Sequence, residues 1–184
     1  MSEQDLRNVF DGFSQRVKDK ALERKACEAE LAGVVGRLVD APEKERQALI
    51  SRRGELVNLR DALSDELEFL SSRKDSAYLA IFEYEQLLAE TKMQKLAGIS
   101  TARRKELEAA IEALRRGGGR GGRVAENEES IRQLAALELK KVKAQTESQV
   151  AYRDVERAKR DFEHAREATE QARRAVGIKQ PVYN

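Results

Sequence analysis

The chain has little of the material from which thick cores and reactive sites are made. Its 184 residues include no tryptophan, one histidine, one cysteine and two prolines, and aromatic residues make up 5%. A single cysteine excludes an internal disulfide, so nothing in the sequence requires an oxidising compartment. The spacings of metal ligands and of nucleophile–base pairs are absent. We therefore expect no catalytic residue, no metal site and no cofactor, and a protein that is not an enzyme.

Long apolar runs are also missing. No stretch approaches the roughly 18 apolar residues that a membrane-spanning helix needs, and the N-terminus has no basic segment followed by an apolar one. The apolar stripes lack the predominantly basic flanks of helices that lie on membranes. We expect a soluble protein of the cytoplasm or of a virion, without a secretory signal and without membrane contact.

Charge is abundant but balanced. Charged residues make up 37% of the chain, against about 25% in an ordinary domain. The 35 basic and 33 acidic residues leave a net charge of +2, which creates no strong field toward nucleic acid. Such a composition is compatible with disorder, or with long helices that share narrow apolar seams.

A seven-residue repeat in the last third of the chain favours the helices. An alanine recurs at every seventh position, and a second seam residue follows each alanine by four. The alanines are Ala144, Ala151, Ala158, Ala165 and Ala172, and the second residues are Ser148, Val155, Phe162, Thr169 and Val176. Residues spaced in this way line one side of a helix and face another helix. Alanine keeps the seam narrow, so the two backbones can approach closely.

Turn signals divide the chain. We expect a helix over residues 3–39, a turn near residues 40–42, a second helix over 42–97, a break or kink at 98–101, a helix to residue 116, a glycine-rich reversal at 117–123 and a last helix over 124–176. Five glycines among residues 117–122 cannot stay helical. The domain organisation is then one elongated domain, 1–176, followed by an extended tail, 177–184.

The predicted fold class is all-α. We expect elongated antiparallel hairpins or a coiled coil of three long helices, the central one kinked near Gly98, with the alanine seam in the last. The turns pair Phe10 with about Ser72, and Phe162 with about Tyr78. Most aromatic residues then meet at the middle of the second helix: Phe10, Phe13, Phe69, Tyr78, Phe82 and Phe162. A full reversal at Gly98 would instead give a compact four-helix bundle.

Polar residues interrupt the first helix, whereas the second has a widened apolar face. Lys20 and Arg24 stand at seam positions, where they could extend outward along their aliphatic stems, or one of them could pair with a partner's carboxylate. Adjacent apolar pairs such as Ile81-Phe82 make the second helix wide enough to contact two neighbours. The residues predicted for association are Leu56, Leu63, Leu70, Ile81, Phe82 and Leu88.

Arginine and glycine alternate at the second reversal. Seven basic and three acidic residues lie between Arg103 and Arg123. Over nine residues this tip resembles the RGG segments of RNA-binding proteins, but it lacks the aromatic residues that stack on bases. The basic residues proposed for contact are Arg115, Arg116, Arg120 and Arg123. Three interpretations stay open: a soluble loop, a nucleic-acid contact and a contact with an acidic protein.

Three further features complete the candidates. Ile178, Val182 and Tyr183 surround Pro181 in the tail, which suits either docking into a neighbour's groove or a frayed terminus. His164 lies off the seam and is expected at the surface, and Cys27 lies on a seam as a small core residue.

The function that fits these features best is that of a non-enzymatic coiled-coil assembly protein. It would act as a spacer, connector or scaffold in a larger oligomeric complex, through self-association or protein partners. Abundant arginine and alanine suit a GC-rich bacterial or bacteriophage genome, and helical hairpins of this length occur in export-apparatus stalks and phage structural proteins. This likeness is one of fold alone. The alternative function is a nucleic-acid-binding hairpin that uses its Arg/Gly tip.

Overall fold

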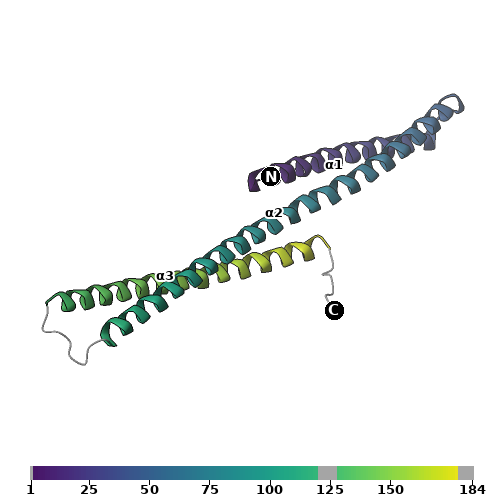
Figure 1. Cartoon of the computed structure of the whole chain (residues 1–184). Coiled ribbons are helices and arrows are strands. Elements are labelled where there is room, and N and C mark those ends of the chain that lie inside the picture. Colours follow the sequence, from purple (N-terminus) through teal and green to yellow (C-terminus); the bar gives the residue numbers. More distant parts are fainter. Residues whose placement is uncertain (1, 120–127, 178–184) are drawn as a thin grey trace. The chain divides into compact units, whose positions relative to one another are not determined.

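Three long helices make up the part of the chain that the structure describes. A computed structural model describes residues 2–119 and 128–177 (Figure 1). Helix α1 spans Glu3–Asp40, α2 spans Glu43–Gly119 and α3 spans Glu128–Ala175. No strand occurs within these ranges, and the predicted all-α class is confirmed. The predicted calls on residues 178–184 and on Arg120 and Arg123 lie outside the described residues.

The first turn lies where the sequence places it. A capping box opens α1: the Ser2 hydroxyl accepts a hydrogen bond from the Asp5 N–H, and the Asp5 carboxylate accepts one from the Ser2 N–H at 2.7 Å. These hydrogen bonds hold the pKa of Asp5 below its ordinary value. The chain is extended at Ala41, and the Pro42 carbonyl then accepts hydrogen bonds from Glu45 and Arg46 as α2 begins.

Helix α2 continues through Gly98, so the predicted break there is wrong. Instead of capping a new helix, Thr101 donates its hydroxyl to the Ala97 carbonyl within the same helix, at 3.0 Å. One exposed glycine costs a helix only about 1 kcal/mol, which the surrounding turns can offset. The alternative of a full reversal at Gly98, and with it the four-helix bundle, is also wrong. A kink at this position stays a prediction.

The chain divides into two units, which are described separately. Unit 1 consists of the described residues up to Tyr84 together with those from Ala172 onward, and unit 2 consists of the described residues within Glu85–Gln171. Unit 1 therefore contains α1, the first half of α2 and the end of α3. Unit 2 contains the second half of α2 and most of α3.

The core of unit 1 lies between α1 and α2. Buried Cys27, Val34, Leu56 and Leu63 pack together, and Leu31, Leu38 and Leu49 cover them in part. Leu49, Leu56 and Leu63 are seven residues apart, so they line one side of α2. Val34 is 0% exposed and Leu56 is 1% exposed, so these two residues are among the most deeply buried of the described chain.

Ion pairs between α1 and α2 show that the two helices run antiparallel. The Arg52 guanidinium lies 2.8 Å from the Glu30 carboxylate, and the Lys20 ammonium lies 3.2 Å from Glu66. Lys20 also pairs with Glu23, and together the two carboxylates raise its pKa, Glu23 having the larger effect. Of the two alternatives that the sequence leaves open, Lys20 therefore takes the pairing with a carboxylate of the facing helix, whereas Arg24 pairs with Glu28 on its own helix.

Only part of the predicted aromatic cluster forms. The Phe10 ring lies 5.7 Å from Tyr78 rather than beside Ser72, and Tyr78 lies 5.0 Å from Phe82. Phe69 is 57% exposed, with the Arg73 guanidinium over its ring. The predicted pairing of residues between α1 and α2 agrees with the structure near the turn and differs from it increasingly with distance from the turn. The prediction assumed that the numbers of paired residues have the same sum along the whole helix pair.

Unit 2 pairs α2 with α3, and the alanine seam faces inward. Ala158 is 1% exposed, while Ala151 and Val155 are 9% and 8% exposed. Across the pair, Lys92 lies 3.1 Å from Asp161, and Arg103 lies 3.0 Å from Glu147. The predicted burial of this seam is confirmed.

The register of this second helix pair differs from the prediction. Asp161 lies beside Lys92, so the predicted pairing of Phe162 with Tyr78 is wrong. The reason lies at the reversal. The prediction that the glycines of residues 117–119 leave the helix is wrong, because α2 extends to Gly119. The prediction also centred the turn near residue 120, whereas α3 begins only at Glu128, which moves the centre of the turn along the chain.

Replacing Ala158 with leucine tests the narrow seam. We expect Ala158→Leu to lower the free energy of unfolding by about 1–3 kcal/mol, because the added atoms have no space between α3 and α2. Urea denaturation followed by circular dichroism measures this change. The matched control is Ala135→Leu on the exposed side of α3, which should change stability by less than about 0.5 kcal/mol. Equal effects of the two substitutions would contradict the tight seam.

Candidate interaction surfaces

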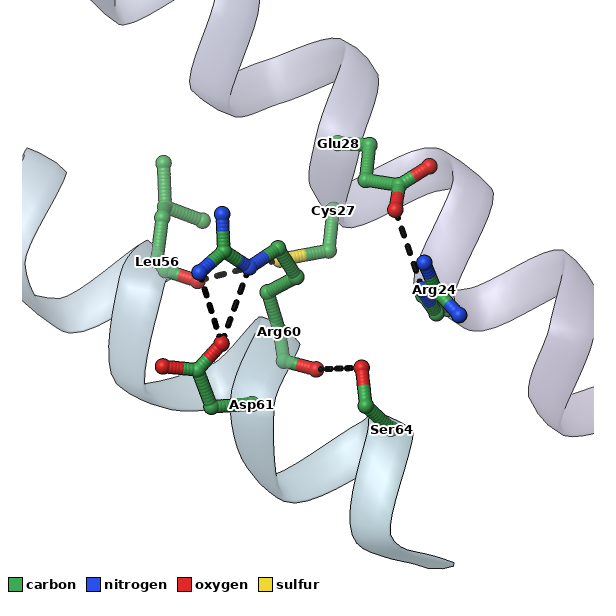
Figure 2. A network of polar contacts seen from close by, with 7 residues as sticks. All are labelled: Arg24, Cys27, Glu28, Leu56, Arg60, Asp61 and Ser64. Atoms are coloured by element: carbon green, nitrogen blue, oxygen red, sulfur yellow. Dashed lines mark hydrogen bonds and ion pairs between the residues drawn. The ribbon is translucent and has the colours of Figure 1, made fainter. Parts of the chain in front are cut away.

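Cys27 and His164 lie in opposite environments. Cys27 is 5% exposed, and its thiol donates a hydrogen bond to the Leu56 carbonyl at a sulfur–oxygen distance of 3.4 Å (Figure 2). His164 is exposed on α3. The two residues belong to different units. The thiol therefore acts as a packed core group that satisfies a helix carbonyl.

The polar side chains near the thiol form pairs with residues of their own helix. The Arg60 guanidinium donates two hydrogen bonds to one oxygen of Asp61, at 2.9 and 2.7 Å, and Ser64 donates to the Arg60 carbonyl (Figure 2). The hydrogen bonds to Asp61 raise the pKa of Arg60. Arg24 pairs with Glu28 on α1 at 3.0 Å. Arg24, Glu28, Arg60 and Asp61 thus each have a partner on their own helix, and the Arg24–Glu28 pair has the four-residue spacing that stabilises a helix.

Clusters of metal ligands are absent from the described residues. Within 2–119 and 128–177, no group of three or more histidine, cysteine, aspartate or glutamate side chains is arranged to hold a metal ion. In the same ranges, no helix has a stretch long and apolar enough to cross a membrane.

Most of the predicted association face of α2 is covered by the chain itself. Leu56, Leu63, Leu70 and Ile81 are all buried, at 6% exposure or less. Phe82 is half-buried against Tyr78. Of the six predicted residues, Leu88 alone is exposed, at 48%, and its neighbour Leu87 is exposed at 58%. The chain itself therefore covers the seam side of α2, whereas residues of the adjacent apolar pairs that widen the face stay exposed, as Ile50 and Phe69 do at 47% and 57%.

Only half of the predicted basic tip can be placed. Arg115 and Arg116 are exposed in the last turns of α2, and Arg116 pairs with Glu112 at 3.0 Å. Arg120 and Arg123 lie outside the described residues. So do Ile178, Val182 and Tyr183 of the tail, and the contact predicted for each of them stays a prediction.

Sequence reasoning missed a groove in unit 2. It has a volume of about 590 Å³ and lies between Leu107 and Ile111 of α2 and a stretch of α3. The α3 residues that line it are Lys141, Gln145, Ser148, Gln149, Tyr152 and Arg153. The groove could have been recognised from the sequence only with the correct register, because its two sides are at least thirty residues apart.

A second missed feature is an apolar stripe on the outer side of α3. Its exposed members are Ile131 at 59%, Leu139 at 72%, Val142 at 57% and Val150 at 51%. Steps of eight, three and eight residues place all four within about 100° of one another around the helix. The signal is present in the sequence, but the stronger alanine repeat masks it.

Comparison of the chain with protein-family models, with curated proteins and with solved structures finds no match. Functional inference therefore rests on the surfaces themselves.

The burial of Cys27 predicts that its thiol reacts slowly with thiol reagents in the folded protein. We expect Ellman's reagent to modify native Cys27 roughly a hundredfold or more slowly than the unfolded chain, because the reaction requires local opening of the α1–α2 core. The control combines Cys27→Ala with Ser51→Cys, which places the thiol on the exposed side of α2. This control should react rapidly in the native state. An equally rapid reaction of native Cys27 would show that its core is open.

Proposed function

We propose that the chain is a non-enzymatic helical structural protein that serves as a spacer, connector or scaffold in a larger assembly. In this proposal it forms elongated antiparallel hairpins, with a kink near Gly98, and associates with further copies or other proteins. A bacterial or bacteriophage assembly, in the cytoplasm or in a virion, belongs to the same proposal.

The exposed apolar stripe of α3 is the observation that carries this proposal. Isolated exposed apolar residues are common on any protein. Four of them in line on one helix, opposite a seam that is already packed, have the spacing of a second helix contact. Leu139 is 72% exposed and Val142 is 57% exposed at the centre of the stripe. In a chain with so little apolar material, such a stripe is best explained by a protein partner.

The small size of the buried residues also supports a function in a larger assembly. The buried apolar residues of unit 2 are mostly small, as Ala110, Ala151 and Ala158 illustrate. Burial contributes roughly 25 cal/mol per Å² of apolar area, so an alanine seam stabilises a helix pair only modestly. Association would add the burial that the isolated helix pair lacks.

Light scattering together with small-angle scattering tests the proposal. We expect an elongated particle whose mass is a multiple of 20.8 kDa. The double variant Leu139→Glu with Val142→Glu should reduce the mass to that of a monomer while helicity is retained, because charges in the stripe oppose its burial. The control, Gln171→Glu with Ala175→Glu, places two glutamates elsewhere on α3 and should leave the mass unchanged. A compact monomer for the unaltered chain would contradict the proposal.

The second candidate function is nucleic-acid binding at the basic tip. The structure favours it in one respect, because unit 2 places Lys141 of α3 beside Ile111 of α2, in the turns that lead to Arg115. Lys140 and Lys143 flank Lys141 in the sequence. Basic residues that are remote in the sequence are thereby brought toward the end of the helix pair that carries the tip.

A salt titration decides whether the tip binds nucleic acid. If it does, replacing Arg115, Arg116, Arg120 and Arg123 with alanine should reduce the slope of log affinity against log salt by roughly 0.7 for each lost contact with a single-stranded oligonucleotide. The control replaces Arg16, Arg37, Arg53 and Arg157, which are exposed elsewhere. An unchanged slope in the tip variant would eliminate this function.

A further inference from the structure

The groove in unit 2 has an apolar floor and a polar rim. Leu107 and Ile111 are half-buried and come from successive turns of α2, while Tyr152 stands on α3 with 62% of its surface exposed. Gln145 and Gln149 provide amide groups along the α3 side. Apolar groups in a concave surface with a few polar groups around them are the usual composition of a protein binding site.

The charge on the rim has one sign. Lys141 and Arg153 line the groove, and no carboxylate does. This contrasts with the chain as a whole, in which 35 basic and 33 acidic residues nearly cancel. Neither Lys141 nor Arg153 forms an ion pair with any residue in the described ranges, and the same is true of Lys140 and Lys143.

Glutamates of the same helix pair are bound to arginines rather than to these cations. Glu108 lies 3.1 Å from Arg104, and Glu147 lies 3.0 Å from Arg103. The end of α2 repeats this pattern, since Glu112 pairs with Arg116. The unpaired positive charge of the groove is therefore available to an acidic ligand.

The length and shape of the groove suit a helix. Its α3 side runs from Lys141 to Arg153, which corresponds to about 18 Å along the helix axis. This distance accommodates three turns of a partner helix, with apolar residues spaced three and four apart on the floor and acidic residues facing the rim. A helix in this position would complete a three-helix arrangement with α2 and α3.

A second copy of the chain is a poor source for such a helix. Its most acidic helical stretch, residues 61–70, buries Leu63 and Leu70 in its own core. Within the same stretch, Asp61 is bound to Arg60, and Glu66 is bound to Lys20. This stretch is therefore unavailable to the groove of a second copy, and the acidic helix is sought in another protein.

We propose that the groove formed by Leu107, Ile111, Lys141, Tyr152 and Arg153 is the docking site for an acidic amphipathic helix of a different protein. This inference rests on the proposed assembly function and names the class of partner that the assembly would contain. Leucine or isoleucine side chains of the partner would contact Leu107 and Ile111, and its carboxylates would pair with Lys141 and Arg153. Tyr152 would cover the apolar contact from one side.

A single-stranded nucleic acid fits the same groove less well. Tyr152 could stack on one base, but the floor consists of aliphatic Leu107 and Ile111, which offer no stacking surface. Nucleic acid is therefore an outcome that the experiment must separate from the proposal.

The test uses the full chain and a designed probe. The probe is a labelled helical peptide of about 21 residues, three heptads long, with leucine at the a and d positions and glutamate at the flanking positions. A second peptide carries lysine in place of every glutamate, and a third probe is a single-stranded oligonucleotide. Fluorescence anisotropy at two salt concentrations measures the affinity for each probe.

We expect the acidic peptide to bind and the basic peptide to bind at least about tenfold more weakly. The variant Lys141→Glu with Arg153→Glu should weaken binding of the acidic peptide by about tenfold or more, because attraction becomes repulsion at both rim positions. The matched control is Lys18→Glu with Arg53→Glu, which makes the same change in net charge on exposed sites of unit 1. This control should retain the affinity of the unaltered chain.

Several results would overturn the proposal. These are no binding of the acidic peptide, equal binding of the two peptides, or an equal loss in the groove variant and in the control. Binding of the oligonucleotide alone, lost in the groove variant, would overturn it in favour of nucleic acid. Failure of the proposed assembly function can be distinguished from failure of the groove proposal. If the chain is monomeric but binds the acidic peptide, the assembly function fails and the groove proposal stands. If the chain self-associates but does not bind the peptide, the groove proposal fails.

Discussion

Close packing of one helix against another along a narrow, seven-residue seam is the contact on which every described part of this protein depends. In unit 1 the seam is built from leucine, valine and Cys27, and Val34 and Leu56 are almost completely buried. In unit 2 it is built largely from alanine, which brings α3 close to α2. Because these seams are thin, the rest of each helix surface stays exposed and must be polar, which explains the high charge content of the chain.

The charged residues contribute to the structure in a different way from the apolar residues of the seams. Most ion pairs within the described ranges link residues three or four apart on one helix and are well exposed, so each contributes little to stability. A smaller set, including Arg52–Glu30, Lys92–Asp161 and Arg173–Glu83, joins different helices. These pairs lie beside seams that would tolerate a shift by one heptad, so their main effect is on register rather than on stability.

The surfaces left over by this packing are where function is best sought. Cys27 is buried in the core between α1 and α2, and the Arg60 guanidinium is paired with Asp61. The stripe around Leu139 and the groove beside Ile111 each gather apolar side chains on one surface of unit 2. Both are parts of unit 2, the unit with the thinner core. A helix pair that is weakly stabilised by its own contacts, and that presents apolar surface, is suited to a protein whose stability depends on its partners.

Local pattern alone determined the helices and their buried sides. The Ala158 repeat, the turn at Pro42 and the glycine run each carry their signal within a few residues, so helix class and seam burial could be predicted. Gly98 misled the prediction, because the cost of one glycine is small against the cooperativity of a long helix. Association through the predicted face of α2 stays a prediction, since Leu63 and Leu70 would look the same in the sequence whether the chain or a partner covered them. In the structure the chain itself buries both residues.

Register was decided only by the tertiary structure. The sequence could not place Phe10 beside Tyr78, or Asp161 beside Lys92, because a seven-residue repeat fits its neighbour nearly as well after a shift of one repeat. Long-range ion pairs and the true length of the second turn remove that ambiguity. The groove exists only in the resulting register, because Ile111 and Tyr152 become neighbours through the folding of α3 against α2 and through nothing local to either residue.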